Sequence, residues 1–191
     1  MEVMQAISDR RSIRRFEDRP VGRHLIETVL DAAVQAPSGK NAQPWRFVVL
    51  QGAKKDGLVD AMEKQVNSLN EAGSPTGSAT WTAKAMRQAP VLILVFDANW
   101  TPGQDRSGLN RYGHLVDTQS IGAAVQNMLL VATSLGLGSL WICDVFYADR
   151  AIGELTGVKE ELVAAVSLGY AAESPGPRPR KPWQEVTAWL E

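Results

Sequence analysis

Four arginines fall within the seven residues RRSIRRF (10–16), near the start of the chain. A guanidinium group is planar, stays charged at physiological pH and matches two phosphate oxygens at once. Arg10, Arg11 and Arg14, together with the Ser12 hydroxyl, could therefore surround one phosphate. A solvated basic turn is the competing interpretation, because runs of surface charge are common. The motif by itself leaves both open.

A second basic group lies near the other end, in ESPGPRPRKPW (173–183). Its prolines favour an extended, stiff segment that can cross a domain and present side chains far from its sequence neighbours. If Arg178 and Arg180 meet the first cluster at one phosphate, the two ends of the chain close a single site. A flexible charged tail is the alternative.

The loop APSGKNAQPW (36–45) concentrates small and amide side chains between two prolines. Ser38, Asn41 and Gln43 can both donate and accept hydrogen bonds, which suits the edge of a planar heterocycle better than a bare charge. Gly39 would let a ligand approach the backbone closely. Ordinary turn chemistry uses the same residue types, so a binding loop and a simple turn remain equally compatible with this stretch.

Familiar nucleotide, hydrolase and metal motifs are absent from the sequence. A P-loop would need Ser or Thr at Asn41, and a dinucleotide fingerprint would need glycine at Trp141. No Gly-x-Ser-x-Gly elbow or Ser-x-x-Lys pair provides a nucleophile. His24 and His114 lie far apart in sequence from each other and from Cys143, so we predict no metal site.

Length and composition bound the class of protein. The 191 residues predict one domain, 1–191, and 20 Lys and Arg against 21 Asp and Glu give a net charge of −1. This balance argues against nucleic acid or an anionic membrane as a partner. The single cysteine fits a reducing compartment, and neither a secretory signal nor a membrane span is recognisable. We therefore expect a cytoplasmic protein.

The elements that must position these residues follow from periodicity and from turn residues. The patterns predict helices over 22–36, 54–71, 81–89, 117–135 and 149–157, and strands over 46–51, 91–97, 139–145 and 163–170. The strand 91–97 is apolar almost throughout and should be covered on both faces, and Gly136 should end the long helix in left-handed geometry. The alternation predicts a sheet with helices on both faces. Irregular segments of the length of 72–80 and 98–114 more often cover a site than merely connect elements.

The ordered set RRSIRRF, APSGKNAQPWRFVVL, KAMRQAPVLILVF, AAVQNMLLVATSLGLGSLWI and RPRKPW resembles the nitroreductase family of FMN-dependent oxidoreductases over nearly the whole chain. The resemblance implies an α+β, nitroreductase-like fold with a central mixed β-sheet flanked by helices. It also implies an intertwined homodimer that holds FMN at the subunit interface. In this family NADH or NADPH passes hydride to flavin N5 and leaves, and a nitroaromatic or quinone-like acceptor then takes its place. No side chain need act as a general acid or base, so we assign no catalytic residue.

The resemblance also implies a set of cofactor-binding residues. Arg10, Arg11 and Ser12, with Arg178 and Arg180, would hold the FMN phosphate and ribityl end. Arg14 would reach the N1 and O2 edge, where a full charge about 4 Å from the reduced ring is worth about 4 kcal/mol at an effective dielectric of 20. Contacts with flavin are further implied for Pro37, Ser38, Gly39, Asn41 and Gln43, partly from the partner subunit, and for Trp141, Ile142, Cys143 and Asp144, whose backbone would lie beside N5.

Several roles stay open at this stage. The thiol of Cys143 is not expected to be a nucleophile, and Asn70 matches a partner of the far ring edge by spacing only. Trp81, Trp100, Arg111 and Tyr112 would either gate the ring face or anchor their loops. The alternative functions are a related flavoenzyme with another acceptor (an enone, a halophenol or flavin itself) and a non-catalytic FMN-binding protein. A nucleic-acid-binding module built on RRSIRRF is disfavoured by the near-neutral charge.

Overall fold

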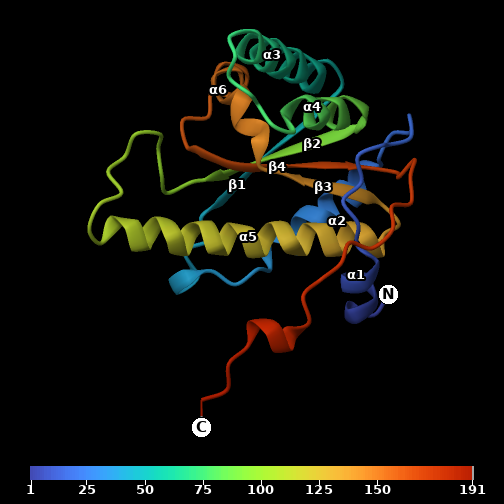
Figure 1. Cartoon of the computed structure of the whole chain (residues 1–191), viewed down its shortest axis with the longest axis vertical. Coiled ribbons are helices and arrows are strands. Elements are labelled where there is room, and N and C mark those ends of the chain that lie inside the picture. Colours follow the sequence, from blue (N-terminus) through green and yellow to red (C-terminus); the bar gives the residue numbers. More distant parts are fainter. Residues whose placement is uncertain (191) are drawn as a thin grey trace.

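The computed structural model describes residues 1–190. The elements follow one another as α1 (Val3–Asp9), α2 (Arg23–Val34), the 3-10 turn η1 (Gly39–Asn41), β1 (Trp45–Gln51), α3 (Gly52–Glu71), α4 (Ala79–Gln88), β2 (Val91–Asp97), α5 (Asn110–Ser134), β3 (Gly138–Ile142), η2 (Asp144–Ala148), α6 (Asp149–Thr156), β4 (Glu161–Gly169) and η3 (Trp183–Val186). Figure 1 shows them in three layers, with the sheet between α3, α4 and α6 on one side and α2 and α5 on the other.

The four strands form one sheet in the order β1-β2-β4-β3. All three strand pairs are antiparallel. The α+β class and the flanking helices are confirmed, but the expectation of a mixed sheet is wrong for these strands. Parallel pairing within residues 1–190 is confined to an isolated bridge between Ser12 and Ser139.

Strand β2 explains why the sheet has a core on each face. All seven of its residues are buried. Because side chains alternate along a strand, Leu92, Leu94 and Phe96 pack with α3, α4 and α6, whereas Val91, Ile93 and Val95 pack with α2 and α5. The continuous apolar run is therefore needed to fill both cores, as the sequence predicted.

The main difference from the sequence expectation is the start of the long helix. The segment 98–114 was expected to be irregular throughout, but α5 begins at Asn110. Its first turns carry Tyr112, Leu115 and Val116 as exposed side chains, so they lack the buried stripe that periodicity detects. The end of α5 agrees with expectation, because Gly136 follows it with a left-handed φ of 73°. The short helix α1 was not anticipated.

The two termini leave the body on the same side of the molecule (Figure 1). Helix α1 packs against α5, and the chain beyond β4 runs past it before extending away through η3. Across residues 1–190, no helix is both long and apolar enough to cross a membrane.

Candidate functional site

The N-terminal arginine segment lies against the chain that follows β4. The backbone N–H of Glu17 donates to the carbonyl of Tyr170 (2.9 Å), and the N–H of Ala172 donates to the carbonyl of Arg15 (2.9 Å). Residues 170–172 lead directly into the proline-rich tail. These hydrogen bonds therefore bring the two basic groups of the sequence side by side.

The apolar residues within RRSIRRF fix which way its arginines face. Ile13 and Phe16 are each 6% exposed and pack inward. A Cβ on Gly138 would lie 2.9 Å from Cγ1 of Ile13, and one on Gly169 would lie 2.9 Å from Cδ1 of Phe16. Glycine at these two positions lets the segment dock closely, and the arginines then point away from the core.

One carboxylate holds the backbone of this segment in place. Glu173 accepts hydrogen bonds from the backbone N–H groups of Arg14 (2.5 Å) and Arg15 (3.1 Å). Because Glu173 engages the backbone rather than the side chains, the guanidinium groups stay available for another partner.

The two basic groups line a single pocket of about 520 Å³. All of the residues that the sequence assigned to a phosphate contribute to its wall: Arg10, Arg11, Ser12, Arg14, Arg178 and Arg180. Within residues 1–190 none of these guanidinium groups forms a salt bridge. Five like charges around one pocket repel one another, and a bound anion relieves that repulsion. This geometry suits a bound anion.

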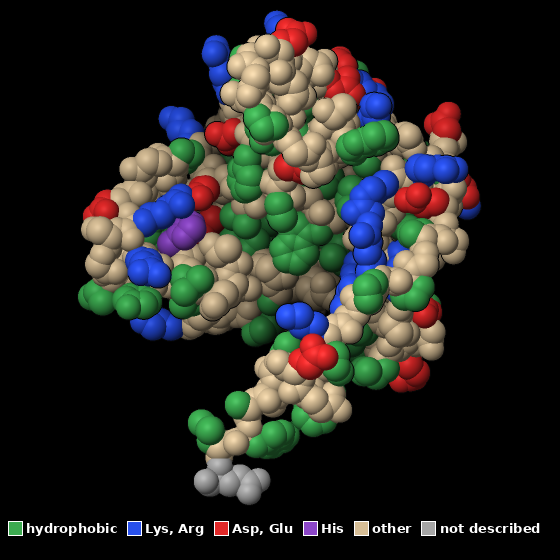
Figure 2. Space-filling view, viewed as in Figure 1, with side chains coloured by type: hydrophobic (Ala, Val, Ile, Leu, Met, Phe, Trp, Pro, Cys, Tyr) green, Lys and Arg blue, Asp and Glu red, His purple; other side chains and the backbone are tan. Residues whose placement is uncertain are grey.

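A second pocket, of about 320 Å³, adjoins the first at Arg14, which lines both. Its walls are the end of β3 with the residues that follow, and the start of α4. The predicted residues 141–144 all line it, together with Ser78, Trp81 and Thr82. Figure 2 shows the corresponding surface, where a column of Lys and Arg side chains runs beside a group of hydrophobic ones.

Sequence reasoning missed Ser78 and Thr82, which hold the carboxylate of Asp144. Its Oδ2 accepts hydrogen bonds from Ser78 Oγ (3.0 Å) and Thr82 Oγ1 (2.9 Å). Partial burial, and after it the charge of Asp144, raise the pKa of the Cys143 thiol. A protonated thiol is a poor nucleophile.

The amide-rich loop is not brought to these pockets within one chain. Pro37, Ser38, Gly39, Asn41 and Gln43 line neither of them. The loop instead sits on the first half of α5, where the N–H of Gly39 donates to Ser120 Oγ (3.3 Å). A Cβ on Gly39 would lie 2.4 Å from Val116 Cγ1, so the close approach that glycine permits here is to α5.

The backbone of this loop is unusual. Lys40, Asn41 and Gln43 have left-handed φ values of 53°, 57° and 48°. Residues other than glycine disfavour left-handed φ values. Backbone strain of this kind tends to persist where the surrounding structure holds a functional loop in place.

Asn70 lies at the end of α3 and Trp81 at the start of α4, on either side of the connecting loop. The side-chain oxygen of Asn70 accepts hydrogen bonds from the backbone N–H (3.2 Å) and the hydroxyl (3.0 Å) of Thr76. Asn70 therefore shapes its own loop and lines neither pocket. Trp81 is 70% exposed and lies under the ammonium group of Lys84, 4.8 Å from the ring centre, so its indole is available at the mouth of the second pocket.

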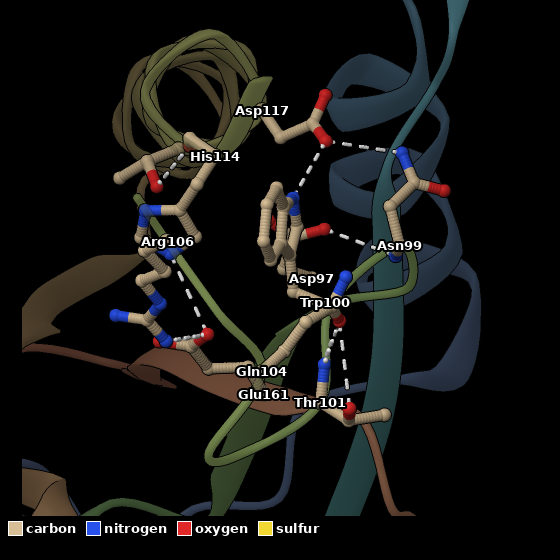
Figure 3. A network of polar contacts seen from close by, with 10 residues as sticks. Asp97, Asn99, Trp100, Thr101, Gln104, Arg106, His114, Asp117 and Glu161 are labelled. Carbon is tan, nitrogen blue, oxygen red and sulfur yellow. Dashed lines mark hydrogen bonds and ion pairs between the residues drawn. The ribbon is translucent and has the colours of Figure 1, made fainter. Parts of the chain in front are cut away.

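Trp100 anchors its loop instead of gating a site (Figure 3). Its ring is 6% exposed, and its indole N–H donates to Asp117 Oδ2 (3.1 Å), which also accepts from the side-chain amide of Asn99 (3.1 Å). The ring also meets His114 edge-on at 5.1 Å. Arg111 and Tyr112 remain exposed at the start of α5.

Asp97, at the base of the same network, is completely buried. Its Oδ1 accepts from the N–H of Asn99 (3.1 Å), whereas Oδ2 has no hydrogen-bond partner in the described chain. The pKa of Asp97 is raised to about 6, mainly by desolvation and further by the charges of Asp117 and Glu161, against the opposing effects of Asn99 and His114. Residues 1–190 contain no cluster of three or more His, Cys, Asp or Glu side chains that could hold a metal ion.

Comparison with known proteins identifies the fold and the family. A family model described as "Nitroreductase family" matches residues 7–170. The chain belongs to the nitroreductase family. The nitroreductase-like fold is confirmed as well, since a crystal structure of a provisionally named nitroreductase in complex with FMN, from Desulfovibrio desulfuricans, is 31% identical and superposes with a TM-score of 0.75. That match covers 100% of this chain and 98% of the other.

Two curated relatives are similar to this nitroreductase-family chain over most of their length. A Methanothermobacter thermautotrophicus protein provisionally named NADH dehydrogenase/NAD(P)H nitroreductase is 34% identical, over 93% of this chain and 82% of the relative. An iodotyrosine deiodinase from Thermotoga neapolitana is 30% identical, over 93% of this chain and 91% of the relative. Relatives whose names point to different substrates thus have similar sequence identities to this chain.

Proposed function

We propose that this nitroreductase-family protein is an FMN-dependent oxidoreductase that transfers hydride from NADH or NADPH, in ping-pong order, to a nitroaromatic or quinone-like acceptor. The observation that carries the proposal is the pocket in which arginines from both ends of the chain meet, none of which forms a salt bridge with another described residue. The relative in complex with FMN supports the choice of anion. A reducing compartment suits the exposed thiol of Cys143, and the cytoplasm remains the proposed location.

The residues present fit FMN by the chemistry of their donors. A phosphate dianion matches the Ser12 hydroxyl and four guanidinium groups of the first pocket, those of Arg10, Arg11, Arg178 and Arg180, and guanidinium forks are the preferred partners of phosphate. Both pockets lie within or near the volume range of small-molecule sites. The adjoining pocket is lined by Trp141 and Ile142 and suits an apolar ring system. When bound, FMN supplies the hydride-accepting N5 atom.

The chain's own residues then bind and tune the cofactor. Arg10, Arg11, Ser12, Arg178 and Arg180 hold the phosphate end. Arg14, which lines both pockets, stabilises negative charge on the pyrimidine side of the ring. The backbone at Cys143 and Asp144 borders the reacting edge, and no side chain has to exchange a proton with it.

We further propose that the protein is an intertwined homodimer in which the loop 37–43 of each subunit completes the site of the other. The loop lies on α5, away from the arginine pocket of its own chain. Large apolar side chains are exposed on α1, at the start of α5 and on the tail, namely Val3, Met4, Ile7, Leu109, Tyr112, Leu115, Trp183, Val186, Trp189 and Leu190. Surfaces of this kind are typical of a protein interface.

The proposal is tested by the absorption spectrum of the purified protein and by anaerobic titration with NADH and NADPH. A flavin spectrum that either nicotinamide bleaches, and that p-nitrobenzoate or a quinone restores, is the expected result. A colourless protein that FMN cannot reconstitute would refute the proposal. Bound FMN that neither nicotinamide reduces would instead indicate a non-catalytic FMN-binding protein. Light scattering on the same sample should give twice the chain mass.

A halogenated phenol is the second candidate acceptor, because the deiodinase relative matches over nearly its whole length. Both candidates share the reductive half-reaction, and only the oxidative half separates them. Anaerobic stopped-flow with the reduced protein should therefore compare p-nitrobenzoate, a quinone and iodotyrosine. Fast reoxidation by iodotyrosine alone would favour the second candidate.

A further inference from the structure

Ser78, Thr82 and Asp144 form a group of hydrogen-bond acceptors in the wall of the second pocket. The hydroxyls of Ser78 and Thr82 both donate their hydrogen bonds to Oδ2 of Asp144. In the described part of the chain Oδ1 of Asp144 has no hydrogen-bond partner, and the two hydroxyl oxygens keep their lone pairs. These residues are thus arranged to receive an N–H or O–H group from a ligand.

Arg14 provides the opposite chemistry in the same pocket. One nitrogen of its guanidinium group donates to the carbonyl of Ser12 (3.2 Å). The other N–H donors of this group have no hydrogen-bond acceptor within residues 1–190. Arg14 and Asp144 line the same pocket but form no ion pair with each other. A ligand edge that alternates acceptors with one N–H donor would satisfy both residues.

The pyrimidine edge of a flavin has this pattern, with carbonyl acceptors on either side of the N3–H group. We infer that the carboxylate of Asp144 accepts a hydrogen bond from N3–H of FMN, and that its negative charge opposes Arg14 in setting how readily the flavin is reduced. This inference rests on the proposed function and adds to it a side-chain role for Asp144. The contacts from Ser78 and Thr82 fix the carboxylate in position.

The charge of Asp144 has a definite consequence for reduction. Reduced flavin carries negative charge on the pyrimidine side, so a nearby carboxylate disfavours it and a nearby guanidinium favours it. Arg14 and Asp144 therefore act in opposite directions on the same equilibrium. Removing the negative charge alone should make the bound flavin easier to reduce.

The hydrogen bond is tested by exchanging the flavin of the protein for FMN or for N3-methyl-FMN, which lacks the N–H. A hydrogen bond to a charged acceptor predicts that the wild type binds FMN roughly 10- to 100-fold more tightly than the methylated analogue. In Asp144→Ala the preference should fall to about threefold or less. Asp149→Ala, an exposed carboxylate on α6, is the matched control and should keep the wild-type preference.

The charge effect is tested separately with Asp144→Asn, which can still accept hydrogen bonds from Ser78 and Thr82. Its affinity for reduced relative to oxidised FMN should rise about tenfold, which raises the two-electron midpoint potential by about 30 mV. Equal binding of the two flavins by the wild type, full discrimination in Asp144→Ala or an unchanged potential in Asp144→Asn would each overturn the inference. Failure of the wild type to bind FMN at all would overturn the proposed function itself.

Discussion

Replacing Asp97 by asparagine should stabilise the protein at neutral pH. The side chain is completely buried at the end of β2, and its Oδ2 atom has no hydrogen-bond partner in residues 1–190. Asparagine has nearly the same shape, still accepts the N–H of Asn99 and removes a charge that desolvation penalises. The neutral amide also removes the repulsion from Asp117 and Glu161, whose charges raise the pKa of Asp97.

The shift in pKa fixes both the size and the pH window of the effect. The pKa of Asp97 is raised from 3.8 to about 6 in the folded protein. Between these values the folded state binds more protons than the unfolded state, so stability falls as pH rises. The contribution is fully present below pH 3.8 and is lost as the pH rises through about 6. At about 1.4 kcal/mol for each pKa unit, the ionised carboxylate costs up to about 3 kcal/mol above pH 7.

The assay is urea unfolding of wild type and Asp97→Asn at one protein concentration and at several pH values from 4 to 8. Tryptophan fluorescence monitors the unfolding. The free energy of unfolding of the variant should exceed that of the wild type by about 1–3 kcal/mol at pH 7.5, and the two should converge near pH 4. If FMN is bound, titration of its phosphate affects both proteins equally and cancels in the difference between their free energies of unfolding. A difference that does not change with pH, or a less stable variant at pH 7.5, would refute the reasoning.

Three further outcomes follow from particular contacts. Gly169→Ala should cost about 1–3 kcal/mol in urea unfolding, because its Cβ would meet Phe16 and the ring of Pro90, whereas Gly153→Ala, which meets nothing within 4 Å, should be neutral or stabilising. Trp100→Phe loses the indole hydrogen bond to Asp117, so limited trypsin digestion should cleave the 98–109 loop faster than in the wild type. Cys143→Ser should keep kcat/KM for NADH or NADPH within about twofold, because the raised pKa of Cys143 keeps its thiol protonated.

The local order of elements could be predicted because it depends on short-range patterns. The run VLILVFD predicts a strand buried on both faces, and every residue of β2 is buried. The beginning of α5 could not be predicted in this way, because its first turns carry exposed apolar side chains and Gly113 in place of a buried stripe. The antiparallel pairing depends on how connections cross the sheet, which composition does not record.

The candidate site also has features that the sequence predicts and features that only the structure shows. The arginines of both termini were candidates from their chemistry, but their meeting depends on backbone hydrogen bonds such as the one between Glu17 and Tyr170. The contact of Ser78 and Thr82 with Asp144 joins residues more than 60 positions apart and has no local signal. The amide-rich loop was a sound candidate by residue type, yet its place on α5 of the same chain could only be found from the structure.

The central claim is that guanidinium groups from the two ends of the chain hold one phosphate, and comparing the dissociation constants of FMN and riboflavin tests it most directly. The wild type should bind FMN about 100-fold or more tightly than riboflavin, and Arg10→Ala and Arg178→Ala should each weaken FMN about tenfold or more with little change for riboflavin. Arg150→Ala, on the exposed face of α6, serves as the control. Equal affinities of the wild type for the two flavins, or an Arg178→Ala variant that still binds FMN like the wild type, would contradict the account.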